Sequence, residues 1–268
     1  MASGCRVSHR LIVAFAVLFS VSGFAVAAET FEDVEKDILA KHEKIKTFAA
    51  KMKMSMDMAG AGAGGMNAKM EQRGTIEYMR DEKGKNLSRT ELKGSMVMKF
   101  GDQEMKQDTE TLTITDAEHT YTLSNMMGKK MAMKNKVDPK TSYNVNSMFT
   151  EFKKEFDMKL LDPAKVDGKA CHVIEAKPKN KYQGQMPFSN MVISIEQERG
   201  VPLKWEMFSK GDKPMITVDI GDYKLNEKID PARFKFTAPE GVQVMDMTKM
   251  KPGAGFGGPG PGFGGSTP

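Results

Sequence analysis

The sequence predicts a mainly antiparallel α+β fold, in which a curled β-sheet is covered in part by helices. Three observations lead to this prediction. Short apolar runs with a period of two recur from residue 50 to residue 225, turn-forming residues separate them, and two stretches show helical spacing. Strands that are this short and this frequent are typical of an antiparallel sheet that curls.

The first helix is expected near residue 30. Thr30 can cap its N-terminus, and Glu32 and Asp33 supply the negative charge that the positive end of a helix dipole favours. Lysines and glutamates lie opposite an apolar stripe, and His42 falls within the stripe. The stripe consists of Phe31, Val34, Ile38, Ile45 and Phe48. This helix is therefore expected to lay one apolar face on another element.

From residue 50 the period changes to two, which marks the first strand. Apolar and polar residues alternate here, and the apolar ones are Ala50, Met52, Met54, Met56 and Met58. Residues 59–65 read as a flexible Gly/Ala loop. Further strands are predicted at residues 74–78, 87–92, 96–100, 112–114 and 121–123. Turn signals separate them at residues 81–85, 93–94, 101–102 and 116–118.

A second helix is predicted over residues 143–156, where the large apolar residues fall on one helix face. These residues are Met148, Phe149, Phe152 and Phe156. After it, residues 191–207 predict a hairpin with apolar residues of period two on both arms. Those residues are Met191, Ile193 and Ile195, then Leu203, Trp205 and Met207.

Three segments are expected along the chain. Residues 1–28 read as a secretory signal peptide, with two arginines, a short apolar run and small residues before the cut. Residues 29–249 are expected to form one domain, and residues 250–268 are a Gly/Pro-rich tail that is expected to be disordered. We therefore expect a periplasmic protein that does not span the membrane after signal cleavage.

Charge and cysteine content exclude several classes of protein. The formal net charge is +5, and loss of Arg6 and Arg10 with the signal peptide leaves +3. A charge this small and scattered does not predict binding to nucleic acid. Cys171 would then be the only cysteine, so the sequence predicts no intramolecular disulfide.

The last folded third resembles the bacterial outer-membrane lipoprotein carriers, the LolA-like family. The resemblance is carried by the hairpin at residues 191–207, by residues 166–178, and by an apolar motif near the end of the domain. That motif includes Tyr223, Leu225, Ile229, Pro231, Phe234, Phe236, Pro239 and Val242. The resemblance implies an incomplete, half-open β-barrel that is covered by the N-terminal helix and the mid-chain helix.

The resemblance also implies a function. Such carriers bind the acyl chains of lipoproteins or lipids in an apolar cavity and ferry them across the periplasm, so an inner-membrane donor and an outer-membrane acceptor are possible partners. The expected cavity lining is Met52, Met54, Met56, Ile76, Tyr78, Leu112, Ile114, Tyr121, Leu123, Leu203, Trp205 and Met207. The expected lid consists of Phe31, Val34, Ile38, Phe149 and Phe152. By analogy with an arginine that locks the lid in the family, Arg80 or Arg89 is expected to hold it.

The methionine content allows three interpretations. The chain has 24 methionines, many at alternating strand positions. A methionine-lined wall adapts to ligands of different shape, which suits a cavity for acyl chains, whereas the same side chains can simply fill a core. Clustered thioethers also select Cu(I), with Met52, Met54, Met56 and Met58 as ligands. No histidine lies at ligand spacing from another, and Cys171 and His172 are expected to be a buried thiol and a surface imidazole.

The sequence predicts a binding protein and not an enzyme. It lacks the nucleophile elbow, the phosphate-binding loop, the zinc-binding helix motif and paired cysteines. The carboxylates of Glu77, Glu91, Asp108 and Glu110 are dispersed over strands, and neither a cofactor nor a metal is expected. An envelope-stress sensor or another lipid-binding module of the same family is the alternative, and a structural protein that assembles through its tail is a third.

Overall fold

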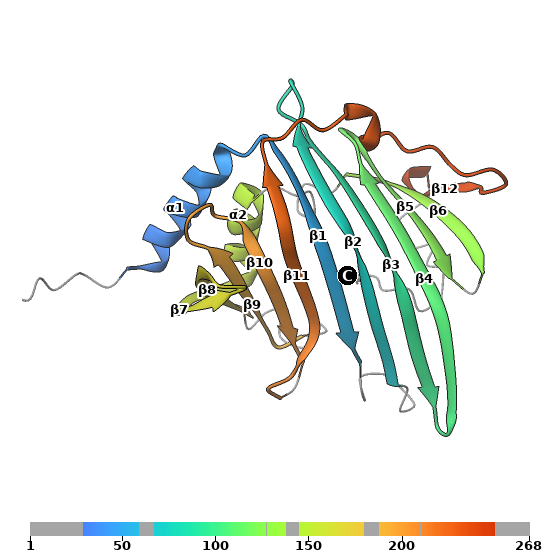
Figure 1. Cartoon of the computed structure of the whole chain (residues 1–268), viewed down its shortest axis with the longest axis horizontal. Helices are drawn as coiled ribbons and strands as arrows, with labels where there is room; N and C mark the ends of the chain where they lie inside the picture. The colour runs from blue at the N-terminus through green and yellow to red at the C-terminus, as the bar shows by residue number, and fades with distance from the viewer. Residues whose placement is uncertain are drawn as a thin grey trace, which may run out of the picture.

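The computed structural model describes residues 29–58, 67–126, 128–137, 145–179, 188–209 and 211–249. In this part of the chain, twelve strands form one sheet, and two α-helices lie at one end of it (Figure 1). The helices are α1 (Phe31–Glu43) and α2 (Val145–Glu155). The strands are β1 (Thr47–Asp57), β2 (Asn67–Arg80), β3 (Asn86–Phe100), β4 (Gln103–Thr115), β5 (His119–Met126), β6 (Lys129–Lys136), β7 (Phe156–Val166), β8 (Lys169–Pro178), β9 (Asn190–Glu196), β10 (Pro202–Phe208), β11 (Pro214–Leu225) and β12 (Val244–Asp246).

The strands follow one another in the order β12-β6-β5-β4-β3-β2-β1-β11-β10-β9-β8-β7. Each neighbouring pair is antiparallel except β12 and β6, which run parallel. Since β12 and β7 are the two edges of this order, the sheet curls without closing on itself (Figure 1). The predicted fold class is therefore confirmed.

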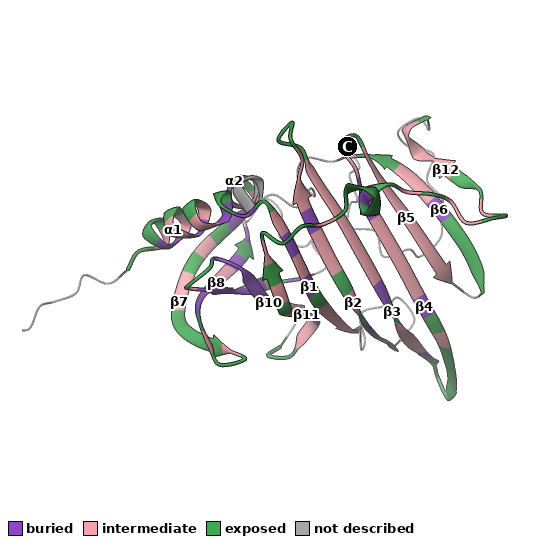
Figure 2. Ribbon diagram, turned by 45° about the horizontal axis from the view of Figure 1, so that its top comes forward, coloured by how far each residue is buried: buried purple, intermediate pink, exposed green. Residues whose placement is uncertain are grey.

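The main core lies where the helices meet the β7 to β9 end of the sheet. Val34 and Ile38 of α1 and Phe149 of α2 pack with Ile174 and Ile193, and each is at most 1% exposed. Figure 2 shows buried positions gathered at this end, whereas the long strands β1 to β5 are mostly intermediate. Burial of apolar side chains therefore holds both helices against one end of the sheet. The side chains of the long strands are only partly covered.

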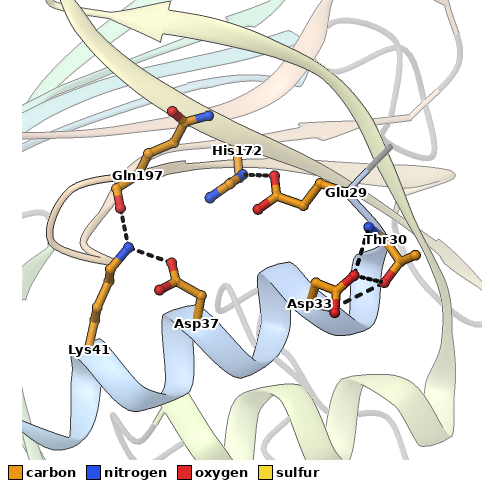
Figure 3. A network of polar contacts seen from close by, with 7 residues as sticks. All are labelled: Glu29, Thr30, Asp33, Asp37, Lys41, His172 and Gln197. Carbon is orange, nitrogen blue, oxygen red and sulfur yellow. Dashed lines mark hydrogen bonds and ion pairs between the residues drawn. The ribbon is translucent and has the colours of Figure 1, made fainter. Parts of the chain in front are cut away.

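The start of α1 agrees with the prediction. The Thr30 hydroxyl accepts a hydrogen bond from the Asp33 N–H (3.2 Å), and the Asp33 carboxylate accepts one from the Thr30 N–H (3.2 Å) (Figure 3). This reciprocal capping box satisfies backbone donors that a helix start leaves unpaired. The helix ends at Glu43, so Ile45 and Phe48 of the predicted stripe lie in the connection to β1 and in β1 itself.

The second helix packs beside the first. The rings of Phe31 and Phe149 have centroids 6.4 Å apart, and the Lys153 ammonium forms an ion pair with the Glu35 carboxylate. The helix was expected over residues 143–156, and α2 spans Val145–Glu155. Phe156 is instead the first residue of β7, where it is buried.

Two glycines let β2 and β3 approach each other closely. A Cβ atom on Gly74 would lie 1.7 Å from the backbone oxygen of Glu91, and one on Gly94 would lie 1.8 Å from that of Glu71. Only glycine leaves room for such an approach, which is a common way to bend and coil a sheet.

The turn predicted at residues 93–94 is therefore wrong. The two strands expected at residues 87–92 and 96–100 form a single strand, β3. Gly94 lies within this strand, where it allows the close contact with β2, and the chain does not reverse there. The turns expected at residues 81–85, 101–102 and 116–118 do connect neighbouring strands.

The C-terminal segment after β11 lies against strands β2 to β6. It contains two short 3-10 helices, η2 (Pro231–Phe234) and η3 (Met247–Lys249). Arg233 forms an ion pair with Glu77 (2.7 Å), and Phe236 stacks on Tyr121 with ring centroids 4.9 Å apart. Phe234 is 2% exposed, so this segment is an integral part of the fold. The predicted signal peptide, the Gly/Ala loop and the tail lie outside the described residues.

Candidate functional site

The strand register divides the side chains of the sheet between two faces. Residues that pair across strands share a face, and successive residues along a strand alternate. Ile193 of β9 belongs to the core that α1 and α2 share, so we call its face the helix-side face and the opposite one the outer face.

Two rows of the helix-side face run unbroken from β9 to β4. The first row consists of Ile193, Trp205, Val218, Met54, Gln72, Gly94 and Thr109. The second, the methionine row, consists of Met191, Met207, Ile216, Met56, Met70, Met96 and Gln107. Five of its seven residues are methionines, and neither row contains a charged residue. At roughly 4.8 Å per strand, the methionine row is about 29 Å long.

The outer face differs sharply from the helix-side face. The row between the two described above holds Val192, Glu206, Thr217, Ser55, Glu71, Ser95 and Asp108. Ion pairs join β3 to β4 on this face, between Lys93 and Glu110 (2.7 Å) and between Lys99 and Glu104 (2.9 Å). In β1 to β5 the lysines and carboxylates thus lie on the outer face, whereas the methionines, with the exception of Met79, lie on the helix-side face.

The methionine row is only half covered. Met191 and Ile216 are buried, 3% and 6% exposed, whereas Met207, Met56, Met70 and Met96 are of intermediate burial. Methionine side chains that merely fill a core are closely surrounded. The part of the row on the long strands therefore presents an adaptable apolar surface.

The predicted lining residues fall on both faces. Seven lie on the helix-side face, namely Met52, Met54, Met56, Ile76, Tyr78, Trp205 and Met207. Four lie on the outer face, namely Leu112, Ile114, Tyr121 and Leu123. Leu203 is buried at a register shift between Pro202 and Lys204. The twelve residues therefore cannot line one cavity, and only the first seven remain candidates.

The C-terminal segment explains why apolar residues occur on the outer face. Ile114 is 1% exposed, and its pairing partner Tyr121 stacks on Phe236. Tyr121 therefore packs against the C-terminal segment.

The predicted lid residues lie together. Val34, Ile38 and Phe149 are in the main core, and Phe31 and Phe152 pack against it in partly buried positions. Figure 3 shows two further attachments of α1: the Lys41 ammonium donates to the Gln197 carbonyl, and His172 Nδ1 lies 3.4 Å from a Glu29 carboxylate oxygen. In this structure α1 is docked, and its movement as a lid stays a prediction.

The two candidate lid-locking arginines lie on different faces. Arg89 is on the outer face, where it donates a hydrogen bond to the Arg233 carbonyl (3.1 Å). It therefore contacts the C-terminal segment and not α1. Arg80 follows Tyr78 on the helix-side face, and its charge acts on His42 of α1. Only Arg80 remains a candidate for a lid contact.

His42 is buried at the end of α1, 3% exposed, with its ring 6.3 Å from the Tyr78 ring. Burial lowers its pKa to about 4, and the nearby charge of Arg80 acts in the same direction. His42 is therefore neutral at neutral pH.

The Cys171 and His172 pair departs in part from the prediction. Cys171 is 0% exposed, which confirms a buried thiol, and burial raises the pKa of that thiol. The expectation of a surface imidazole is wrong, because His172 is 7% exposed next to Glu29. β8 is covered on both faces at this point, so alternation does not bring one of the two residues to solvent.

Three polar side chains on the helix-side face were not singled out by the sequence. The Gln72 amide nitrogen donates to the Thr109 hydroxyl (3.1 Å), and both residues are less than 9% exposed. Gln107 ends the methionine row, and its amide oxygen and nitrogen are both buried without a hydrogen-bond partner among the described residues. The sequence did contain a signal for the face on which Gln107 and Thr109 lie. In β4, charged residues alternate with uncharged ones from residue 103 to residue 111, and these two residues are among the uncharged ones.

A small pocket lies on the outer face, with a volume of about 170 Å³. Leu112 and Leu123 contribute to it, and Glu91, Lys93 and Lys130 lie among the charged residues around it. Ligand pockets usually have about 300 to 1,000 Å³, so this pocket is too small and too highly charged for an acyl chain.

The described residues contain no group of three or more His, Cys, Asp and Glu side chains that is suited to a metal ion. None of the helices in the described ranges combines the length and the apolar character that crossing a membrane requires. The register places Met52, Met54 and Met56 on one face, and Cu(I) binding by them stays one of the three interpretations of the methionine content.

A family model described only as that of an uncharacterized protein matches residues 92–251, which is more than half of the chain. The chain is also 26% identical over 121 residues to an uncharacterized protein of Methanocaldococcus jannaschii. This match covers 45% of the chain and 33% of that protein, so the chain spans about a third of its relative.

Several solved structures are similar to the chain at low sequence identity. An uncharacterized conserved protein from Thermus thermophilus is 10% identical with a TM-score of 0.46, covering 80% of this chain and 98% of that one. The MucA/MucB complex of Pseudomonas aeruginosa is 10% identical with a TM-score of 0.42, covering 76% and 61%. A LolA superfamily protein from Nitrosomonas europaea is 12% identical with a TM-score of 0.28, covering 75% and 97%. These similarities concern the arrangement of the chain and not its function.

Proposed function

We propose that this chain, which belongs to the family of uncharacterized proteins matched over residues 92–251, is a non-enzymatic carrier that binds the acyl chains of lipids or lipoproteins on its helix-side face. One observation supports this proposal above the others. The sheet keeps charge on its outer face and presents a half-covered methionine row on its helix-side face.

The physical chemistry of acyl chains suits this surface. Each methylene that leaves water contributes about 0.8 kcal/mol, and the interaction needs no directional partner. Methionine is flexible and polarisable, so Met56, Met70 and Met96 can adapt to a chain of varying length and unsaturation. Release then requires a rearrangement of the covering elements and no bond cleavage.

The helices are the natural covering elements for such a site. α1 and α2 dock on the end of the sheet where the methionine row begins, at Met191. The finer parts of the proposal rest on the sequence resemblance to LolA-like carriers. They are a periplasmic location, transfer toward the outer membrane, and donor and acceptor proteins.

The single tryptophan makes the proposal directly testable. Trp205 is the only tryptophan in the chain, and it lies in the row next to the methionine row. Bromine atoms on an acyl chain quench tryptophan fluorescence at contact distance. We expect a brominated fatty acyl glycerol to quench Trp205, and the same lipid without bromine to leave its emission intensity nearly unchanged. Absence of saturable quenching would contradict the proposal.

Two neighbouring positions of β1 provide a matched pair of variants. Met54 is on the helix-side face in the row of Trp205, and Ser55 is on the outer face opposite Glu71. Met54→Lys puts an unpaired charge on the apolar surface and is expected to weaken acyl binding at least about tenfold. Ser55→Lys should leave binding unchanged. Equal binding by both variants would show that the chains do not lie on this face.

A further inference from the structure

Sulfur is the property of the helix-side face that acyl binding does not explain. Any apolar side chain can hold an acyl chain, so leucine or isoleucine would serve as well as methionine. The chain nevertheless carries 24 methionines, and the register brings many of them together on this face. A thioether adds to an apolar surface a polarisable sulfur atom that can bind a soft metal ion.

The sequence placed the possible metal ligands along one strand, whereas the register gathers thioethers across strands. In β2, Gly74 lies opposite Met52. Gln72 lies opposite Met54, so neither methionine has a thioether facing it from β2. Residues two apart along a strand are about 6.8 Å from each other, whereas the Cβ atoms of directly opposed residues are about 4.5 to 5.5 Å apart. Methionines on neighbouring strands can therefore share a metal ion more readily than those of β1 alone.

Three methionines of β2 and β3 lie close enough together to share one ion. Met70 lies directly opposite Met96, and Met98 is the next residue of β3 on the same face. Met98 is also the diagonal neighbour of Met70, at a distance of about 7 to 8 Å that long side chains can bridge. We call Met70, Met96 and Met98 the thioether cluster. Met56 and Met105 extend it, because they lie opposite Met70 and Met98.

The surroundings of the thioether cluster offer no ligands for a hard or borderline metal ion. Among the described residues of β1 to β6, the helix-side face carries no carboxylate, imidazole or thiol. Its charged residues are Arg80, at the far end of β2, and Lys129, in β6. Calcium, magnesium and zinc ions require the oxygen, imidazole or thiolate donors that are missing here. Thioethers select Cu(I), whose single charge also needs less compensation than that of a divalent ion.

The cluster is accessible to an ion. Met70 and Met96 are of intermediate burial, and Met98 is 9% exposed. Met105, next to Met98, is among the exposed large apolar residues. A small ion can therefore reach the sulfur atoms from solvent and still be partly shielded once it is bound.

We propose that the thioether cluster is a binding site for Cu(I), with the Sδ atoms of Met70, Met96 and Met98 as its ligands. The ion binds as Cu(I), and no electron is transferred. This inference goes beyond the proposed carrier function and does not depend on it.

Anaerobic titration of the protein with Cu(I), kept reduced by ascorbate and in competition with a chromophoric chelator, tests the proposal. We expect a saturable site, and we expect Met96→Leu to weaken it at least about tenfold. Met79→Leu, on the outer face of β2, is the matched control and should bind like the wild type. Leucine has nearly the volume of methionine, so both variants should keep the fold, which thermal unfolding checks.

Two measurements on the wild-type protein do not depend on a variant. X-ray absorption of the Cu(I) complex should show a ligand shell of sulfur alone. The affinity should be equal at pH 6 and pH 8, since a thioether has no proton to lose, whereas an imidazole site would weaken at pH 6.

An absence of Cu(I) binding, a nitrogen or oxygen shell, or an affinity that falls at pH 6 would overturn the proposal. So would a Met96→Leu protein that binds like Met79→Leu. None of these results bears on the carrier function, because leucine keeps the face apolar and quenching of Trp205 by a brominated acyl chain is measured without metal.

Discussion

His42 is a titratable side chain buried at the joint between α1 and β1. Its pKa is lowered from 6.5 to about 4, chiefly by burial and further by Arg80. The folded protein therefore binds a proton at this site less readily than the unfolded chain. The contribution of the neutral His42 imidazole to the free energy of unfolding is therefore fully present above about pH 6.5 and is lost as the pH falls toward 4.

We predict that the free energy of unfolding decreases by about 1.4 kcal/mol per pH unit between pH 6.5 and 4 because of His42, on the order of 3 kcal/mol in all. Urea unfolding of the wild type and of His42→Leu over this range measures the effect. The variant should show a smaller slope. Ser55→Ala, on the outer face of β1, changes no titratable group, so it serves as the control and should keep the wild-type slope. Parallel curves for the wild type and His42→Leu would contradict this account.

At the scale of single elements, the coiling of the sheet depends on the two glycines between β2 and β3. Gly94 faces the Glu71 carbonyl and Gly74 faces the Glu91 carbonyl at distances that no Cβ can occupy. The backbone itself is the obstacle, so a rotamer change of a neighbouring side chain cannot relieve it.

We predict that Gly94→Ala lowers the free energy of unfolding by at least about 2 kcal/mol, because β3 must move away from β2. Gly221→Ala in β11 is the control, since nothing lies within 4 Å of its Cβ position. It should change stability by less than about 0.5 kcal/mol. A Gly94→Ala protein that unfolds like Gly221→Ala would show that the close approach is not required for the fold.

At the scale of the whole molecule, the sequence predicted the elements better than their faces. Period-two alternation and turn residues are local signals, and they predicted most strands, the hairpin at residues 191–207 and the fold class. Which face a strand presents depends on its partners, and a slip of one residue inverts it. Leu112 and Ile114 were therefore assigned to the cavity, although the register places both on the outer face, where Ile114 is buried.

The alternation of charged and uncharged residues would have predicted the two faces of the sheet better than the positions of the apolar residues did. In β4, Glu104, Lys106, Asp108 and Glu110 mark the outer face, so that Gln107 and Thr109 must lie on the other. The methionines alternate with polar and charged residues in the same way along β1. The unpaired state of Gln107 and the burial of His172 could not be predicted, because both depend on contacts between distant parts of the chain.

The central claim is that acyl chains lie on the helix-side face, and the methionines themselves allow its most direct measurement. Met54, Met56, Met70 and Met96 lie on that face, while Met79 of β2 lies on the outer face. With ¹³C-labelled methionine methyl groups assigned by substitution, titration with an acylglycerol should shift the signals of the first four and leave Met79 unchanged. Shifts confined to Met79, or an unchanged spectrum at saturating lipid, would contradict the account.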